Sequence, residues 1–166
     1  MGKPDSAPAE AVRRGYDFCG KGWRMEVKVF KRLPEEAKEI RIKVFVEEQG
    51  FQDEFDHTDD ISTHIVLFEA SEPIAVCRFY YSAERQCYVI GRIAVLKEFR
   101  GRDLGTALLR AAEQEIMRMH GKTAELSAQV RASVFYEKNG YVSLGETHMD
   151  EGCPNVWMKK KLRPDT

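Results

Sequence analysis

The sequence predicts an α+β fold in which a mixed, largely antiparallel sheet is flanked by helices. Strand and helix patterns follow one another from Met25 onward in the order β-α-β-β-β-α-β-α-β-β. Three of the strand patterns are consecutive and joined by short turns, which is typical of an antiparallel meander. The later alternation of strands and helices indicates a central β-α-β-α unit.

Size and composition limit the domain organisation and the classes of partner. The chain has 166 residues, 43% of them hydrophobic and 32% charged, so we expect one core and one domain over residues 24–166. Residues 1–23 mix small, polar, Gly and Pro residues without apolar periodicity, which predicts a disordered leader. The net charge of −1 argues against a nucleic-acid partner. The apolar runs are strand-sized, so we expect no membrane span.

The four cysteines are scattered along the chain. Cys19, Cys77, Cys87 and Cys153 form no CxxC pair, and no His cluster has metal-ligand spacing. We therefore expect no metal site, and free thiols in a cytoplasmic protein.

The first half of the domain begins with an alternating strand, "MEVKVFK", followed by a helix that Pro34 opens and Gly50 ends. The apolar face of this helix consists of Ala37, Ile40, Val44 and Phe45. An acidic connector over residues 51–60 leads to strands at 63–70, 73–82 and 87–96, which are expected to form the meander.

The second half begins with the stretch "EFRGRDLGTALL", residues 98–109, which runs into a long helix. The residues expected to be buried on this helix are Leu104, Leu108, Ala111, Ile116 and Met119, and Gly121 is expected at its C′ position. A strand at 123–130 and a helix at 131–140 follow, and Asn139-Gly140 ends the helix. Strands at 141–149 and 155–162 close the chain and offer an edge for pairing in a homodimer.

The turn before the long helix has the features of a phosphate site. Backbone N–H groups at a helix start converge on one point, and the helix dipole favours an anion there. Gly101 and Gly105 allow close approach, while Lys97, Arg100 and Arg102 add positive charge. A structural role explains the glycines as well: Gly101 makes a turn and Gly105 lets the helix pack closely on the sheet.

Two motifs in sequence order carry a family resemblance. "RIAVLKEFRGRDLGTALL" resembles the acetyl-CoA-binding motif of the GNAT-superfamily N-acetyltransferases, with Arg100, Asp103 and Gly105 at its three defined positions. "AQVRASVFYEKNGYV" resembles the second signature of that family, and the residues that match it are Ala132, Phe135, Tyr136, Gly140 and Tyr141. The stretches "VFVEEQGF", "DHTDDISTH" and "EGCPNVWMKKKL" resemble the ElaA/YjcF-like branch.

The resemblance implies an enzyme that transfers the acetyl group of acetyl-CoA to a primary amine by direct attack in a ternary complex. It places the pantetheine arm along the strand at Ile93, Ala94 and Val95, with the N–H near Val95 stabilising the oxyanion. It assigns cofactor contacts to Arg100, Gly101, Arg102, Asp103, Leu104, Gly105, Thr106 and Gln129, where the amides of residues 101–106 hold the pyrophosphate. Gln129 stands where many relatives carry Asn.

Tyr136 is the predicted general acid that hydrogen-bonds the departing sulfur of CoA. The alternative is a purely structural aromatic residue, because Ala132, Phe135 and Tyr136 lie on one helix face.

Asp103 departs from the family pattern, which usually has Gly at this position. Asp tolerates the left-handed backbone conformation and suits a helix start, where its carboxylate is expected to cap free N–H groups. We expect the side chain to point away from the phosphates, toward Arg100 or Arg102.

The acceptor side is predicted from charge. Seven carboxylates and no Lys or Arg lie between Glu47 and Asp60, and such a rim attracts a cationic amine. The residues predicted to contact the acceptor, a small-molecule or protein amine, are Glu47, Glu48, Glu54, Asp56, His64 and Arg78. The alternatives are a solvated acidic loop and, for Arg78 and Arg92, structural pairing with these acids.

Two other functions remain open on the sequence. The first is a GNAT-fold module that senses acetyl-CoA without turning it over. The second is an acyltransferase similar to the acyl-homoserine-lactone synthases, which the pattern at Arg41–Phe45 and the following acids also resemble.

Overall fold

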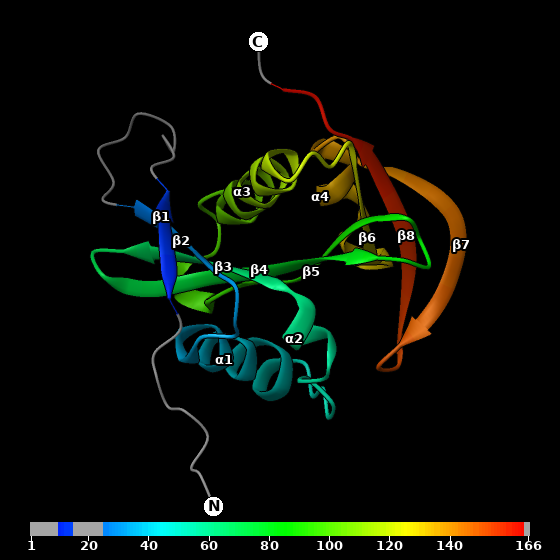
Figure 1. Ribbon diagram of the computed structural model, residues 1–166. Helices are drawn as coiled ribbons and strands as arrows, with labels where there is room; N and C mark the ends of the chain where they lie inside the picture. The colour runs from blue at the N-terminus through cyan, green and yellow to red at the C-terminus, as the bar shows by residue number, and fades with distance from the viewer. Residues whose placement is uncertain (1–9, 15–24, 165–166) are drawn as a thin grey trace, which may run out of the picture.

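The structure is a computed structural model that describes residues 10–14 and 25–164. The strands within these residues are β1 (Ala11–Arg14), β2 (Met25–Phe30), β3 (Thr63–Glu69), β4 (Glu72–Ser82), β5 (Cys87–Val95), β6 (Thr123–Gln129), β7 (Val142–Asp150) and β8 (Cys153–Lys161). The α-helices are α1 (Glu35–Arg41), α2 (Thr58–Ile61), α3 (Leu104–Arg118) and α4 (Ser133–Lys138). The strands form one sheet in the order β1-β2-β3-β4-β5-β6-β8-β7, with α1 and α2 on one face and α3 and α4 on the other (Figure 1).

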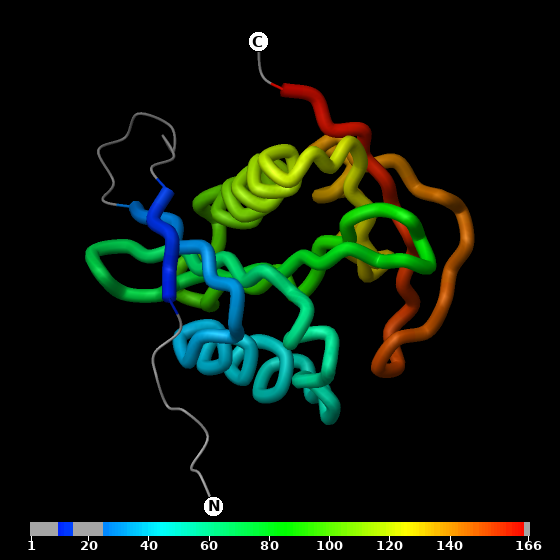
Figure 2. The backbone as a smooth tube through the Cα atoms, in the orientation of Figure 1, coloured from blue at the N-terminus to red at the C-terminus, as the bar shows by residue number. Residues whose placement is uncertain are grey.

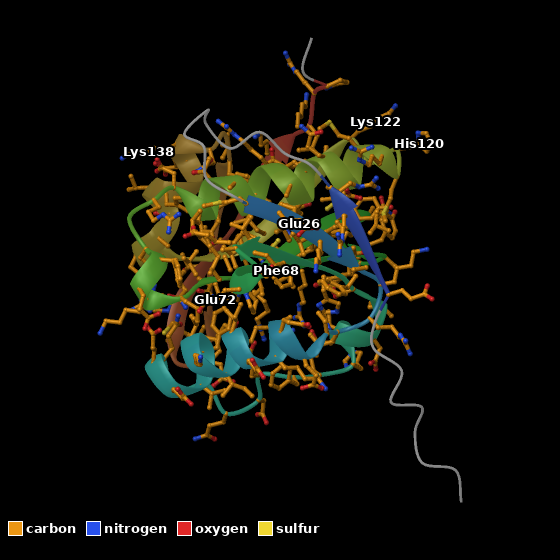
Figure 3. All side chains as sticks on the ribbon, turned by 90° about the vertical axis from the view of Figure 1, so that its left-hand side faces the viewer. Glu26, Phe68, Glu72, His120, Lys122 and Lys138 are labelled. Atoms are coloured by element: carbon orange, nitrogen blue, oxygen red, sulfur yellow. The ribbon has the colours of Figure 1, made fainter. Side chains whose placement is uncertain are left out.

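The predicted mixed α+β architecture is confirmed. Strands β3, β4 and β5 form the expected antiparallel meander, and β5 and β6 make a parallel pair within the described sheet. Both faces of the sheet are covered, and β3 shows how its side chains divide between them. Ile65 and Leu67 belong to the core under α3, whereas Val66 and Phe68 belong to the core over α1. Figure 3 labels Phe68 between the sheet and α1.

The N-terminal segment differs from the prediction. The expected disordered leader over residues 1–23 is wrong for residues 11–14, which form β1 and pair antiparallel with residues 27–30 of β2. The backbone groups on the outer edge of β2 supply the hydrogen-bonding partners that order this segment. The rest of the predicted leader, apart from Glu10, lies outside the described residues.

The first helix has the predicted buried face, with Ala37, Ile40, Val44 and Phe45 all in the core. Its second half is a π-helix over Ile42–Glu48, a feature that the periodicity did not predict. The helix ends before Gly50, whose φ of 75° requires the left-handed conformation that Gly adopts without cost. The acidic connector that follows is not simply a loop, because it contains most of α2.

Helix α3 packs against the sheet as expected, except at its C-terminal end. Met119, predicted to be buried, is 44% exposed because the helix ends at Arg118. The left-handed residue that terminates the helix is His120 (φ 65°), not the predicted Gly121. A Cβ on Gly121 would lie 2.4 Å from Ile116 Cγ2, so close packing explains this glycine. Figure 3 shows His120 and Lys122 where α3 gives way to β6.

The C-terminal hairpin determines the far edge of the sheet. Strand β8 lies between β6 and β7, so only β7 offers the predicted edge for pairing (Figure 2). Asn139 and Gly140, the latter with φ 93°, end α4 as predicted. A homodimer through this edge stays a prediction.

Candidate active site

The candidate site is a cleft that opens where β5 and β6 separate. These parallel strands pair at Tyr88–Ala124 and Val89–Glu125. The register between β4 and β5 then shifts, because two residues of β5, Arg92 and Ile93, lie opposite one residue of β4. Such a bulge bends a strand and ends its regular pairing.

A cavity of about 220 Å³ occupies this cleft. The residues that line it are Phe45, Gln49, Phe51, Ile90, Gly91, Arg92, Ile93, Leu126, Ser127, Gln129, Ala132, Tyr136, Asp150 and Asn155. They come from the first helix and the residues just after it, from β5 and β6, from α4 and the turn before it, and from the β7–β8 hairpin, segments that are distant in the sequence.

Tyr136 lines this cavity from α4. Its ring packs edge-on against Phe135 and Tyr141, with centroids 5.0 and 6.3 Å away. Burial, together with the nearby Cys77 thiol, raises the pKa of Tyr136 to about 12. The tyrosine is therefore both a packed aromatic residue and a cleft residue whose hydroxyl keeps its proton at neutral pH.

The end of β5 presents backbone groups to the cleft. The N–H of Leu96 donates to Ile74 O on the β4 side, 3.0 Å away. Successive residues of a strand direct their amides to opposite edges, so the N–H of Val95 faces the β6 side. Arg100 Nε reaches the same edge and donates to Val95 O at 3.0 Å.

The loop between β5 and α3 has the shape of an anion site. Gly101 (φ 83°) and Asp103 (φ 57°) are both left-handed, and a Cβ on Gly101 would meet no atom within 4 Å. The first hydrogen bond of α3 runs from Ala107 N to Asp103 O, which leaves the N–H groups of residues 104–106 without intrahelical acceptors. These amides and the dipole of a 15-residue helix favour a phosphate at this point.

The side chain of Asp103 does not cap this helix, so that part of the prediction is wrong. The left-handed backbone carries the carboxylate outside the range of the N–H groups that a capping residue in extended conformation reaches.

The loop arginines face acidic partners. Arg100 forms an ion pair with Glu48 at 2.9 Å, and Arg102 forms one with Glu69. These pairs link the loop to the first helix and to β3, and they offset part of the positive charge expected around a phosphate.

Gly105 faces α4 rather than the sheet. A Cβ at this position would lie 2.9 Å from Phe135 Cζ. The glycine therefore lets the start of α3 meet the helix that carries Tyr136.

The acidic segment forms a buried ion-pair network under α1. Arg41 Nε donates to Glu54 Oε1 at 2.8 Å, and Asp59 Oδ1 accepts from both Arg41 at 2.6 Å and Arg78 at 2.7 Å. Burial alone would raise the pKa of Asp59, but the hydrogen bonds and charges of the two arginines outweigh it and lower the pKa to about 2.

The alternative of a solvated acidic loop is therefore wrong for Glu54 and Asp59, which are buried, and the alternative of structural pairing with Arg78 and Arg92 is confirmed for these two acids. Burial raises the pKa of Glu54, against the attraction of Arg92 and Arg41. His64 is also buried, and its Nε2 lies 3.0 Å from Asp59 O; burial lowers the pKa of this imidazole. Glu54, His64 and Arg78 lie outside the cavity lining, so their contact with an acceptor stays a prediction.

The remaining predicted residues differ in whether they line the cavity. Gln129 lines the cavity and donates to Gln49 Oε1 at 3.0 Å. Glu47 and Asp56 are exposed. Sequence reasoning did not select Gln49, Asp150 and Asn155 as site residues. Gln49 and Asn155 lie in the stretches "VFVEEQGF" and "EGCPNVWMKKKL", whose resemblance to the ElaA/YjcF-like branch was the available signal, and only the tertiary fold brings the three residues to the cleft.

Metal centres and membrane-spanning helices are two further features that would bear on function. Residues 10–14 and 25–164 contain no group of three or more His, Cys, Asp or Glu side chains placed to hold a metal ion. Among the helices of this part of the chain, none combines the length and apolar character needed to cross a bilayer.

Comparison with known families agrees with the geometry of the cleft. The profile of the family described as "Acetyltransferase (GNAT) domain" matches residues 31–162. The chain belongs to this GNAT family. Its bulged strand, helix-start loop and diverging β5–β6 pair are thus parts of a GNAT acyl-CoA N-acyltransferase fold.

Individual GNAT relatives match most of the chain. The uncharacterised N-acetyltransferase YjcF of Bacillus subtilis (strain 168) is 32% identical over 129 residues, which are 73% of this chain and 87% of YjcF. The crystal structure of Escherichia coli ElaA superposes with a TM-score of 0.68 at 27% identity, covering 76% of this chain and 88% of that chain. An aminoglycoside 6′-N-acetyltransferase solved with coenzyme A shares the fold, with a TM-score of 0.67 at 15% identity and coverage of 84% and 98%.

Proposed function

We propose that this GNAT protein transfers the acetyl group of acetyl-CoA to a primary amine by direct attack in a ternary complex. The observation that carries the proposal is the position of Tyr136, which lines the cavity between the separated strands together with Ile93 of β5. In this reaction a C–N bond forms, the C–S bond of the thioester breaks, and the proton lost by the amine balances the proton gained by the thiolate.

The loop before α3 fits the pyrophosphate of CoA. The N–H groups of residues 104–106 are available there, and the left-handed Gly101 has no atom within 4 Å of a would-be Cβ, so a ligand can approach the backbone. Acetyl-CoA supplies the activated acyl group as a thioester. The N–H of Val95, on the cleft edge of β5, stabilises the oxyanion that develops on the carbonyl.

Tyr136 donates a hydrogen bond to the sulfur as the C–S bond breaks. Burial raises its pKa to about 12, whereas thiols titrate near 8.5. Complete transfer of the tyrosine proton to the thiolate is therefore unfavourable in free energy. The proton that the attacking amine releases returns the tyrosine to its protonated form. The hydroxyl stays protonated through the neutral range, so the contribution of Tyr136 to kcat is expected to be constant from pH 6 to about 11.

The test measures CoA thiol release from acetyl-CoA with purified protein and a panel of polyamines, amino acids, aminoglycosides and arylamines. We expect turnover with at least one class. Tyr136→Phe should lower kcat about 100-fold and leave the Kd for CoA unchanged. The matched control is Tyr81→Phe, because Tyr81 is exposed on β4 and lies outside the cavity lining.

Two outcomes would contradict the proposal. Wild-type turnover in Tyr136→Phe over the whole pH range would remove the role of this tyrosine. A rise in Tm with acetyl-CoA, without CoA release by any acceptor, would instead favour the sensing module.

A further inference from the structure

The cavity carries opposite charges on different walls. Arg92 lines it from the bulge of β5, and Asp150 lines it from the end of β7. Asn155 of β8 lines the same space, next to Gln129 in the β6–β8 register. A ligand that fits here meets a cation, an anion and an amide.

Arg92 has hydrogen-bonding capacity to spare. Its Nε forms an ion pair with Glu54 Oε1 at 3.2 Å, but the geometry is not that of a hydrogen bond, and this buried nitrogen has no hydrogen-bond partner among the described residues. The side chain is 20% exposed and its guanidinium lies 5.8 Å from the centroid of Phe45. Since a guanidinium offers five N–H donors in a planar fork, Arg92 is suited to a carboxylate.

Arg92 is the most exposed of the three arginines in the buried network. The guanidinium groups of Arg41, Arg78 and Arg92 pair with the carboxylates of Glu54 and Asp59, and Arg78 also pairs with Asp56. Arg41 already makes two hydrogen bonds to Glu54: its Nε donates to the carboxylate, and its Nη2 donates to the backbone oxygen. Arg92 therefore shares Glu54 with Arg41.

The nearest additional anion in the network does not reach Arg92. Asp56 lies 3.5 Å from Arg78 and its side chain is 42% exposed, so it offsets charge at Arg78. Among the described residues Arg92 therefore has one ion-pair partner, the carboxylate of Glu54 that it shares with Arg41, and a ligand carboxylate at the cavity wall would add a second.

Asn155 supplies the second unsatisfied group. It is 4% exposed, and its Oδ1 is buried without a hydrogen-bond partner within the described residues. A buried amide oxygen without a donor is costly, and an N–H group of a ligand would satisfy it. The carboxylate of Asp150 on the same cavity adds attraction for a cationic ammonium group.

We propose that the acceptor is a small amine that carries a carboxylate close to its amino group, as an α-amino acid does. Arg92 binds the carboxylate, and Asn155 and Asp150 hold the amino end. Because Tyr136 and Ile93 of the same cavity of about 220 Å³ are assigned to the thioester end of acetyl-CoA, the space left beside it favours a compact acceptor. This inference rests on the proposed acetyl transfer.

The first experiment compares matched acceptors with acetyl-CoA and the full-length protein. Each L-amino acid of a panel is paired with its amide and with the amine that lacks the carboxyl group, and CoA thiol release gives kcat/KM. We expect the best acid to exceed both of its counterparts without a carboxylate by about 10- to 100-fold, the range of a charge-assisted hydrogen-bonded pair. Equal or faster turnover of the counterparts without a carboxylate would overturn the inference while leaving acetyl transfer intact.

Variants locate the carboxylate site. Arg92→Met should raise the KM for the acid and reduce the acid-to-amine ratio to within about threefold, with the Kd for CoA unchanged. Asn155→Ala should raise KM for acid and amine alike, because it removes the partner of the amino end. The matched control is Arg110→Met, an exposed arginine of α3 that lies outside this cavity. An unchanged ratio in Arg92→Met contradicts the assignment.

A binding measurement separates this inference from the transfer reaction. Calorimetry in the presence of CoA compares N-acetyl-L-amino acids with their N-methylamides. We expect selective binding of the acids that is lost in Arg92→Met and kept in Arg110→Met, and this result supports the carboxylate site. If no acceptor is turned over while this binding is seen, only the proposed transfer function fails. Equal binding of both sets, or binding of neither, overturns the inference.

Discussion

Arg41 and Glu54 form a fully buried ion pair, with Nε and Oε1 2.8 Å apart and both side chains 1% exposed. Removing one member leaves the other charge buried without its partner, which costs about 3–5 kcal/mol. We expect Arg41→Met and Glu54→Gln each to lower the free energy of unfolding in urea by an amount of this order.

The control for this prediction is an exposed pair on the same helix. Lys38 and Glu35 lie 3.1 Å apart at the surface, and Lys38→Met should cost less than about 0.5 kcal/mol. Similar small losses in all three variants would show that the buried pair does not stabilise the fold.

Asp59 should make stability depend on pH in the acidic range. The pKa of its carboxyl is about 2 in the folded protein and 3.8 as the ordinary value, so its contribution is present above about pH 4 and lost as the pH falls toward 2. Asp59→Asn should therefore be less stable than wild type by about 2 kcal/mol at pH 7.

Urea unfolding of both proteins between pH 2 and pH 7 measures this difference. We expect the gap between wild type and Asp59→Asn to narrow steadily below pH 4. A gap that stays constant across this range would exclude ionisation of Asp59 as its cause.

Gly105 tests the contact between the start of α3 and α4. Helix propensity alone predicts that Gly105→Ala stabilises by up to about 1 kcal/mol. The 2.9 Å approach of a Cβ to Phe135 predicts the opposite, a loss of about 1–3 kcal/mol from overpacking. Because Phe135 adjoins Tyr136, we also expect weaker CoA binding by isothermal titration calorimetry.

The matched control is Gly91→Ala, where a Cβ meets no atom within 4 Å. Its stability should stay within about 0.5 kcal/mol of wild type. A stabilising Gly105→Ala would show that Phe135 moves aside at no cost.

Asp103 tests the loop itself. Its φ of 57° is strained for most residues and free for glycine, and its side chain makes no capping hydrogen bond that glycine would lose. Asp103→Gly should raise Tm slightly and keep or tighten CoA binding, since a negative charge next to the phosphates is removed. Asp103→Val should lower both the Tm and the affinity for CoA, because a β-branched side chain is strained at this φ. Loss of CoA binding in Asp103→Gly would contradict this account of the loop.

The regular elements were predictable because their signals are local. Alternation identified β3 to β5, and helical spacing identified the buried face at Ala37 and Phe45, since each pattern needs only a few neighbouring residues to be recognised. Local reasoning failed where a distant segment decides the outcome. β1 forms because the edge of β2 is available. His120 takes the left-handed turn, whereas Gly121 is required because a Cβ there would clash with Ile116 and Tyr88.

The sequence by itself determined most of the strands and helices from Met25 onward, the two motifs and the left-handed tolerance at Asp103, all properties of short segments. Only the tertiary structure decided which charges face each other. It paired Glu54 and Asp59 with arginines from the first helix and β4, and it brought Arg92, Asp150 and Asn155 to one cavity. The physical reason is that burial and ion pairing depend on sheet order, and the order β5-β6-β8-β7 joins residues that no local pattern connects.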